Sequence, residues 1–515
     1  MNRREFVEAI GAATTLAAAE ALAAAPAEFD PAEKTIAELS AAQAQGRASA
    51  ESLTQGYLRR IERYDRRGPA LRAVLAVNPQ ALAAARALDV ERRAGRVRGP
   101  LHGIPLLIKD NVETRDPLPT TAGSLALAAA RHATDAPVAA QLRAAGAVIL
   151  GKANLSEWAN FRSTRSVSGW SGVGGQTRCP YDPARNPSGS SAGPAAGAAA
   201  SLCAAAIGSE TDGSILAPAS INGLVGLKPT VGLVSGVGVV PITTRQDTTG
   251  PMTRTVADAA LLASLMAQPG ARWDGVTALD TLPRGLRLGV LPPPDSAHPD
   301  VLRQLPDWLK VLQGAGLTLV DVAAPAAWAT LSDDELEVLL YDFKADINAY
   351  LARFNGVLPV RTLADLIEFN RRHADAEMPF FGQELFEQAQ AKGTRTEPAY
   401  AKALQHVQQA ADTHGLAALF TQHRLDALVA PGNGPAELID HVWGDRHENS
   451  GGWPSMCSAA AVAGFPSLTV PAGFVAGLPV GIHFVAPRFR EGRLLQIGGA
   501  FERARNARRP PRLES

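Results

Sequence analysis

The sequence predicts an α/β fold in which helices cover a layered β-sheet. Between residues 104 and 153, short apolar runs alternate with a helical pattern: "IPLLIKD", then "VAAQLRAAG", then "AVILGKA". Apolar runs bounded by turn residues return near the C-terminus, in "LDALVAPGN" at 425–433 and "PSLTVPAGF" at 466–474. Strand and helix signals that alternate in this way are typical of an α/β layer architecture.

Residues 31–98 carry helical patterns ahead of the first of these apolar runs. Two amphipathic runs are separated near Gly46, and a third run has Pro79 near its start and Gly95 near its end. Proline and glycine favour those two positions of a helix. Residues 160–192 are rich in Gly, Ser, Arg and Pro without a clear period, which predicts a long loop. Loops of that length inside a compact protein are often functional.

An Ala-rich helix is expected over 195–207, and the strand-like stretch "GLVGLKPTVGLVS" follows at 223–235. Residues 275–425 contain one strand signal, "LRLGVLPPP", but long helical segments dominate there. We interpret this region as a helical insertion into a sheet whose last strands come from the C-terminal part. A final helix is expected over 492–505.

Composition excludes several classes of partner. Lys plus Arg and Asp plus Glu both number 50, so the formal net charge is zero and gives no reason to expect nucleic acid or an anionic membrane. The three cysteines, Cys179, Cys203 and Cys457, have no spacing typical of a zinc site or a disulfide framework. We expect no metal and no cofactor, and the oligomeric state is left open.

The first 27 residues differ from the rest of the chain. Arg3 and Arg4 precede a short, weakly apolar, Ala-rich stretch that ends in small residues suited to cleavage near Ala25. This pattern resembles a twin-arginine export signal; the alternative is an Ala-rich N-terminal helix. No later stretch reaches the 18 or so apolar residues that a spanning helix needs. The sequence therefore predicts an exported, periplasmic or secreted protein without stable membrane insertion.

Serine chemistry has two candidate arrangements. "GSSAG" at 189–193 fits the G-x-S-x-G pattern in which Ser191 would be a nucleophile, but that pattern needs a strand leading into the turn. The segment before it is interrupted by Pro180, Pro183 and Pro187, so this interpretation is rejected. Lys109 at a strand end, Ser190 in a Gly-rich turn and Ser214 in "TDGS" each have an ordinary structural explanation when taken alone.

Together the motifs are specific. "GIPLLIKDN", "NPSGSSAG", "SETDGSILAPASINGLVGLKPTVGLV" and "TTGPMTRTVADAALL" resemble the amidase signature family of serine amide hydrolases. The resemblance covers most of the chain after residue 70 and implies a large twisted mixed sheet between helices. It also implies that residues 28–515 form a single amidase domain. The two serines of the family's Ser–cis-Ser–Lys triad lie 24 positions apart, and positions 190 and 214 have that spacing.

Carried over, the resemblance implies that Ser214 is the nucleophile, Ser190 the bridging serine and Lys109 the base, with Ser191 in support. A cis peptide is implied before Ser190, where Gly189 would ease crowding. Lys109 must be neutral to accept a proton, and burial lowers the pKa of a lysine from its ordinary value of about 10.4. Backbone N–H groups of "TDG" (Thr211, Asp212 and Gly213) would stabilise the oxyanion, and acylation of Ser214 would release ammonia or an amine.

Departures from the family pattern bear on the substrate. Leu216 stands where many members have an arginine for a substrate carboxylate, and Glu210 and Asp212 replace the residues of the common "DTGGS". "ETDGS" and the helical insertion look closest to the peptide amidase branch, whose members release ammonia from C-terminal peptide amides. Arylamides, aliphatic and cyclic amides stay open as substrates. The alternatives are an ammonia-donating component of a glutamine-type amidotransferase and an exported solute-binding protein.

Overall fold

The computed structural model describes residues 29–276, 279–354, 356–445 and 455–514. The export signal expected at residues 1–27 lies outside these described ranges. Among the described residues, no helix combines the length and the apolar character that crossing a membrane requires. The thiols of all three cysteines are buried and free.

The core of the fold is a mixed sheet of eleven strands in the order β1-β3-β2-β6-β8-β7-β12-β13-β11-β9-β10, which confirms the predicted fold class. Strands β3, β2 and β6 run parallel, as do β11, β9 and β10, and the strands between these two groups pair antiparallel. Their bounds are β1 Val74–Val77, β2 Pro105–Lys109, β3 Val148–Ala153, β6 Ala205–Glu210, β7 Val225–Lys228, β8 Thr248–Thr253, β9 Arg287–Val290, β10 Thr318–Asp321, β11 Ala427–Pro431, β12 Ser467–Val475 and β13 Leu478–Val485. A separate hairpin pairs β4 (Trp170–Ser171) with β5 (Gly175–Gln176).

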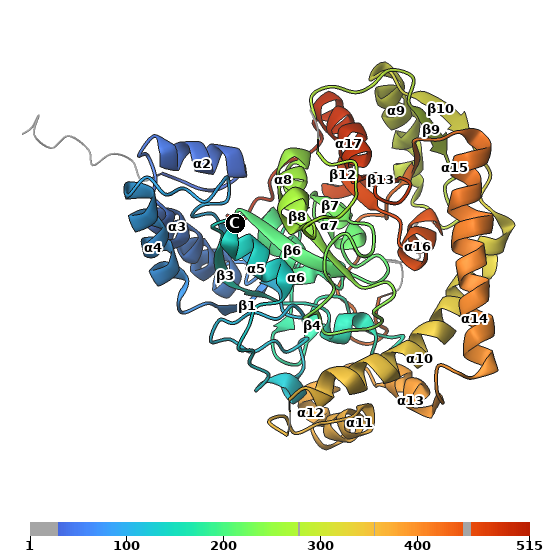
Figure 1. The fold of residues 1–515 in the computed structure, drawn as a ribbon, viewed down its shortest axis with the longest axis horizontal. Helices are drawn as coiled ribbons and strands as arrows, with labels where there is room; N and C mark the ends of the chain where they lie inside the picture. Colours follow the sequence, from blue (N-terminus) through green and yellow to red (C-terminus); the bar gives the residue numbers. More distant parts are fainter. Residues whose placement is uncertain (1–28, 277–278, 355, 446–454, 515) are drawn as a thin grey trace, which may run out of the picture.

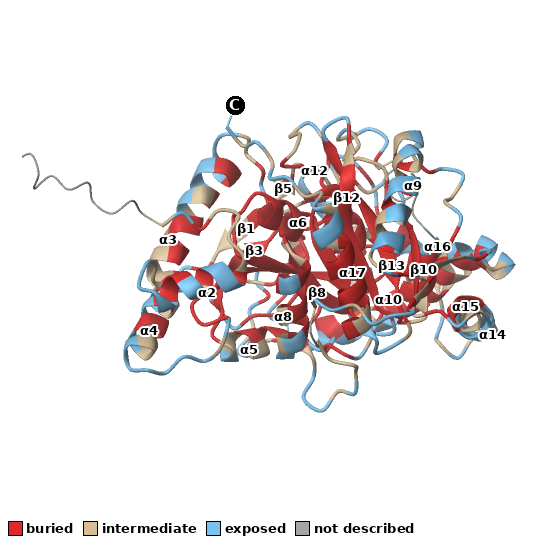
Figure 2. Cartoon of the chain, turned by 90° about the horizontal axis from the view of Figure 1, so that it is seen from above, coloured by how far each residue is buried: buried red, intermediate tan, exposed pale blue. Residues whose placement is uncertain are grey.

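Helices cover both faces of this sheet (Figure 1), as the alternation of side chains along β13 shows. Ile482 and Phe484 pack in the apolar cluster formed with α17 (Glu491–Arg505), α8 (Val256–Met266) and α9 (Pro299–Gly314). His483 and Val485 point the other way, towards α16 (Ser455–Val462). Also on this second face are α7 (Leu216–Ile221) and α6 (Ala192–Ala199). Burial is continuous through the sheet and drops on the outer helix surfaces (Figure 2).

The remaining helices lie at the two ends of the sheet. Near β1 and β3 lie α2 (Ile36–Ala44), α3 (Ala50–Arg60) and α4 (Ala81–Arg93), as the helical patterns predicted, with α5 (Pro137–Ala144) between β2 and β3 in sequence. At the other end, a helical arm curves along the edge of the molecule (Figure 1). It consists of α10 (Leu331–Ala352), α11 (Leu363–Arg372), α12 (Ala374–Glu377), α13 (Glu384–Ala391), α14 (Pro398–Gln408) and α15 (Ala417–His423).

The structure corrects three boundaries. The helix expected over 195–207 begins at Ala192 and ends at Ala199, and residues 205–210 form strand β6, because they pair on both sides with β2 and β8. Residues 31–98 contain a short strand, β1, in addition to helices. The segment 275–425 supplies two strands, β9 and β10, with the helix α9 between them, so its uninterrupted helical part begins only near residue 326. The expected loop at 160–192 is irregular apart from the β4–β5 hairpin and a short turn of helix at its start.

Candidate active site

Lys109 is the last residue of β2 and has no solvent exposure. Its Nζ lies 2.8 Å from Ser190 Oγ, 2.9 Å from Ser209 Oγ and 3.1 Å from the Ser209 carbonyl oxygen. A neutral amine has two N–H donors and one lone pair. Ser209 supplies two acceptors for the donors, which leaves the lone pair for the hydroxyl proton of Ser190.

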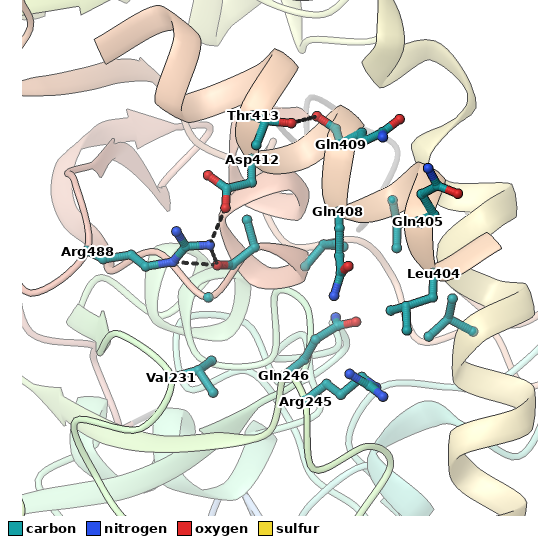
Figure 3. Close-up of a pocket in the computed structure, with 15 residues that line it drawn as sticks. Val231, Arg245, Gln246, Leu404, Gln405, Gln408, Gln409, Asp412, Thr413 and Arg488 are labelled. Carbon is teal, nitrogen blue, oxygen red and sulfur yellow. Dashed lines mark hydrogen bonds and ion pairs between the residues drawn. The ribbon is translucent and has the colours of Figure 1, made fainter. Parts of the chain in front are cut away.

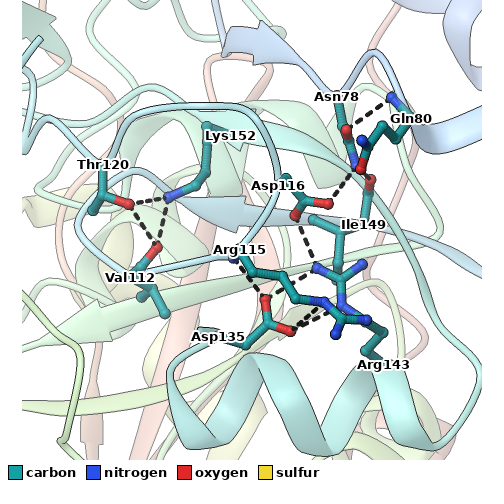
Figure 4. A network of polar contacts seen from close by, with 10 residues as sticks. All are labelled: Asn78, Gln80, Val112, Arg115, Asp116, Thr120, Asp135, Arg143, Ile149 and Lys152. Atoms are coloured by element: carbon teal, nitrogen blue, oxygen red, sulfur yellow. Dashed lines mark hydrogen bonds and ion pairs between the residues drawn. The ribbon is translucent and has the colours of Figure 1, made fainter. Parts of the chain in front are cut away.

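The carboxylate next to Lys109 in the sequence does not neutralise it. Side chains alternate across a strand, and Asp110 lies instead 3.5 Å from the Nζ of Lys152, a buried lysine of β3. Lys152 also donates to the carbonyl of Val112 and to Thr120 Oγ1 (Figure 4), which fixes the loop after β2. Among the described residues, no ion pair involves Lys109.

Burial therefore acts on Lys109 with little compensation. Loss of solvation lowers the pKa of Lys109 to about 7, opposed only in part by the charges of Asp247 and Glu210. Lys228, the third fully buried lysine, differs in its partners: its Nζ donates to the carbonyl oxygens of Pro229 and Phe465. Of these three lysines, Lys109 is the one whose Nζ contacts the serine expected to bridge to the nucleophile.

Ser190 follows a cis peptide bond with Gly189, as the resemblance implied. A Cβ atom on Gly189 would lie 2.2 Å from Ser156 Oγ, so this position accepts no side chain. The Ser190 carbonyl accepts a hydrogen bond from the Ser156 N–H at 3.1 Å. Ser191 Oγ donates to the Ser209 carbonyl at 3.0 Å and accepts from the Ser209 N–H at 3.2 Å. Ser191 thus ties the serine turn to the strand that leads to Ser214.

Ser214 lies in the turn between β6 and α7, which Gly213 makes with a φ of +77° that L side chains rarely adopt. Glu210 accepts hydrogen bonds from the N–H groups of Ile215 at 2.7 Å and Leu216 at 3.0 Å, so its carboxylate caps α7 directly behind the serine. The Ser214 carbonyl accepts from the Ser191 N–H at 3.1 Å. Ser214 is 7% exposed, whereas Ser190 is fully buried.

The structure thus brings Lys109, Ser190, Ser191 and Ser214 together. Lys109 contacts Ser190 directly, and Ser214 joins the group through the backbone bond from Ser191. Within the described residues, no side-chain hydrogen bond of the Ser214 hydroxyl is found. Thr211, Asp212 and Gly213 form the turn immediately before Ser214.

Comparison with known proteins decides the family. A family model described as Amidase matches residues 52–495. This chain belongs to the amidase signature family. A probable amidase of Arabidopsis thaliana is 38% identical over 508 residues, with 94% of this chain and 92% of the relative covered. A component of the glutamyl-tRNA(Gln) amidotransferase of Halorhodospira halophila is 35% identical, with 91% of this chain and 97% of the relative covered.

Solved structures agree with the fold and with the branch. A peptide amidase in complex with the competitive inhibitor chymostatin is 46% identical with a TM-score of 0.87, covering 94% of this chain and 100% of that chain. The native peptide amidase from Stenotrophomonas maltophilia is 44% identical with a TM-score of 0.86, covering 95% and 100%. The chain is therefore an amidase that hydrolyses amide bonds, and the resemblance to the peptide amidase branch is confirmed.

From the sequence, Trp170, Phe380 and Phe381 are interpreted as core residues rather than the lining of an acyl pocket. Three histidines, His441, His447 and His483, are interpreted as structural, because Lys109 already supplies the base. Trp170 packs edge-on against Phe380 and Phe381, with ring centroids 5.7 and 5.2 Å apart, and Trp170 and Phe381 are buried. His441 stacks on Phe380, and its Nε2 lies 3.2 Å from Gln176 Oε1. Buried His483 lies 3.7 Å from Cys457 Sγ, and burial lowers its pKa to about 3. His447 lies outside the described residues.

Sequence reasoning missed several residues of the amidase site. Ser209 provides two of the three contacts of Lys109 Nζ, and Asn111 Nδ2 donates to Ser209 Oγ at 2.9 Å. Both lie inside the quoted motifs: Asn111 is two residues from Lys109, and Ser209 is one residue from Glu210. Their place in these motifs was the signal from which a role in the site could have been predicted. Gln246 donates to the Thr211 carbonyl in the turn before Ser214, and Glu335 accepts from Gln246. Both come from segments far away in the sequence and carried no signal.

Proposed function

We propose that this amidase hydrolyses the C-terminal carboxamide of peptides and releases ammonia, with Ser214 as nucleophile, Ser190 as bridging serine and Lys109 as base. The observation that carries the mechanism is the buried Lys109 Nζ, 2.8 Å from Ser190 Oγ, with its pKa lowered to about 7 by burial. A lysine in this state accepts a proton near neutral pH, which an exposed lysine does not.

In the proposed mechanism, Ser214 Oγ attacks the amide carbon and its proton passes through Ser190 Oγ to Lys109 Nζ. The carbonyl oxygen becomes an oxyanion and accepts hydrogen bonds from the N–H groups of the Thr211–Gly213 turn. The proton returns through Ser190 to the leaving nitrogen, the C–N bond breaks and ammonia departs. Water then attacks the acyl-enzyme by the same route in reverse, which frees the carboxylic acid and Ser214.

Two observations support a peptide amide as substrate. The solved peptide amidases resemble this chain at 44–46% identity over at least 94% of its length. Leu216 is buried in an apolar cluster with Met456, Ala459 and Ala460, so position 216 offers no cation to a free substrate carboxylate. A neutral carboxamide end is compatible with that environment, whereas an acid end loses its hydration without a charged partner.

A panel of amides tests the substrate. We expect peptide amides to give kcat/KM values about tenfold or more above those of matched anilides, simple aliphatic amides and free glutamine. Released ammonia or amine is measured for each compound with the purified enzyme. A preference for anilides would contradict the peptide substrate and leave the amidase family standing. Glutamine hydrolysis that requires added partner proteins would instead support the amidotransferase alternative.

We also propose that the chain is exported through the twin-arginine route. The support is the Arg3–Arg4 pair followed by an Ala-rich stretch that ends in small residues near Ala25. N-terminal sequencing of the protein from its source cells is expected to begin close after Ala25, and the protein is expected in the periplasmic or extracellular fraction. Full-length protein with an intact Met1, found in the cytoplasmic fraction, would contradict export.

A further inference from the structure

One face of α10 carries three carboxylates that hold a single turn of the chain. Glu335, Asp342 and Asp346 are spaced by seven and four residues, which places them on the same side of a helix. Asp342 Oδ2 accepts from Thr243 Oγ1 at 2.7 Å, and Asp346 Oδ2 accepts from the Thr244 N–H at 2.9 Å. The helical arm is therefore hydrogen-bonded, through α10, to the segment that precedes β8.

Glu335 reaches the next residues of the same segment. Gln246 Nε2 donates to Glu335 Oε1 at 2.7 Å and also to the carbonyl oxygen of Thr211 at 3.3 Å. Asp247 Oδ1 accepts from Thr211 Oγ1 at 2.6 Å. Asp247 Oδ2 is itself fixed by the N–H of Ile242 at 2.9 Å. Thr211 is thus held at its carbonyl and at its hydroxyl by two consecutive residues.

The hydrogen bond from Gln246 to the Thr211 carbonyl oxygen sets the direction of the Asp212 N–H group. A peptide unit is planar, and in the trans form its C=O and N–H point in opposite directions. Within the described residues the Gly189–Ser190 bond is the one cis peptide, so the unit between Thr211 and Asp212 is trans. When Gln246 fixes the Thr211 oxygen, the same rigid plane fixes the Asp212 N–H, which is one of the expected oxyanion donors.

Gln246 would have room to move if Glu335 did not hold it. Gln246 and Arg245 line a cavity of about 580 Å³ together with residues of α10, α14 and the segments after them (Figure 3). Glu335 and Gln246 are 6% and 4% exposed, so their hydrogen bond has little competition from bulk water. Burial also raises the pKa of Glu335 well above its ordinary value, which favours the neutral acid.

We propose that Glu335 is a positioning residue for amide hydrolysis: through Gln246 it fixes the peptide plane between Thr211 and Asp212, and so couples the helical arm to oxyanion stabilisation. This inference rests on the proposed role of the Thr211–Gly213 N–H groups. Glu335 acts through Gln246 and touches no reacting atom. Its effect belongs to the transition state, because negative charge on the carbonyl oxygen develops as Ser214 attacks and is absent from the bound substrate.

Steady-state kinetics on a peptide amide tests this coupling. Glu335→Leu and Gln246→Leu are each expected to lower kcat about 10- to 100-fold while KM stays within about threefold. The double variant is expected to lose no more than Gln246→Leu alone, since both changes break one chain of contacts. Glu335→Gln keeps a side-chain oxygen that can accept from Gln246, and is expected to retain most of kcat.

The matched control is Glu337→Gln on the same helix. Glu337 forms a 2.6 Å ion pair with Lys392, on another side of α10 from the 242–247 segment. The kcat of Glu337→Gln is therefore expected to equal that of the unmodified enzyme. The inference is overturned if Gln246→Leu and Glu335→Leu keep full kcat, or if Glu335→Gln is as damaging as Glu335→Leu. If Glu335→Leu does not fold, Gln246→Leu decides the question. Loss of activity in Ser214→Ala tests the proposed mechanism separately.

Discussion

Replacing Ser214 by alanine is expected to lower kcat for amide hydrolysis by about 10⁴-fold or more, which is the scale of losses when a catalytic serine is removed. No acyl-enzyme forms without the hydroxyl, and the backbone of the Thr211–Gly213 turn is left in place. Stability should change little, because the Ser214 hydroxyl has no side-chain hydrogen bond among the described residues. Ammonia release, ligand binding and thermal unfolding of the variant are the measurements.

Ser191→Ala is the matched control for this experiment. Ser191 is the neighbouring candidate from the G-x-S-x-G pattern, but its hydroxyl is engaged with the Ser209 carbonyl and N–H. We expect a partial loss of kcat and a lower melting temperature, because a buried structural bond is removed. Full ammonia release by Ser214→Ala, or complete loss of turnover in Ser191→Ala alone, would reverse the assignment. Ligand binding without any turnover by the unmodified protein would support the solute-binding alternative.

The sequence predicted the elements whose signals are local. Apolar runs bounded by turn residues located β2, β3 and the C-terminal strands, since a fully buried strand needs a continuous apolar run. The same signal located β9, which is buried at its two central residues. Strand β6 was missed because "AAIGSE" has the composition of a helix, and its conformation is decided by pairing with β2 and β8. The glycine at position 208 of β6 is likewise required by tertiary packing, because a Cβ atom there would lie 2.8 Å from Ser191 Oγ.

The residues of the candidate site also separate into those with a local sequence signal and those without one. Lys109, Ser190 and Ser214 were predicted because each lies in an ordered motif, and the spacing of the two serines matches that of the family. Gln246 and Glu335 were not, because the contact between them joins residues 89 positions apart and depends on how α10 packs against the segment before β8. A glutamine before "DTTGPM" carries no local signal, so only the fold shows what it holds.

Replacing Lys109 by methionine is expected to lower kcat/KM by about 10³-fold or more, near the upper range for loss of a general base. Methionine has a similar length and is apolar, so it can occupy the buried end of β2 without a charge. In the unmodified enzyme, kcat/KM should rise as pH increases through about 7, because the protonated amine cannot accept the proton from Ser190. A kcat/KM that is independent of pH between about 5 and 9 would contradict Lys109 as the base.

The same residue predicts a change in the pH dependence of stability. The pKa of Lys109 is about 7 when folded, below its ordinary value of about 10.4. Between these values the unfolded chain binds a proton that the folded chain does not, so this group makes the free energy of unfolding rise with pH. Below about pH 7 Lys109 is protonated in the folded chain as well, so the folded state is destabilised by the full free-energy cost of burying an ammonium group. Lys109→Met removes this contribution, so the unfolding free energy of this variant in urea should rise less steeply from pH 7 to 10 than that of the unmodified enzyme. Lys310→Met, at an exposed site, is the control. If the unfolding free energies of the unmodified enzyme and Lys109→Met depend on pH in parallel, Lys109 keeps an ordinary pKa in the fold. An amine that stays charged could not take the proton from Ser190.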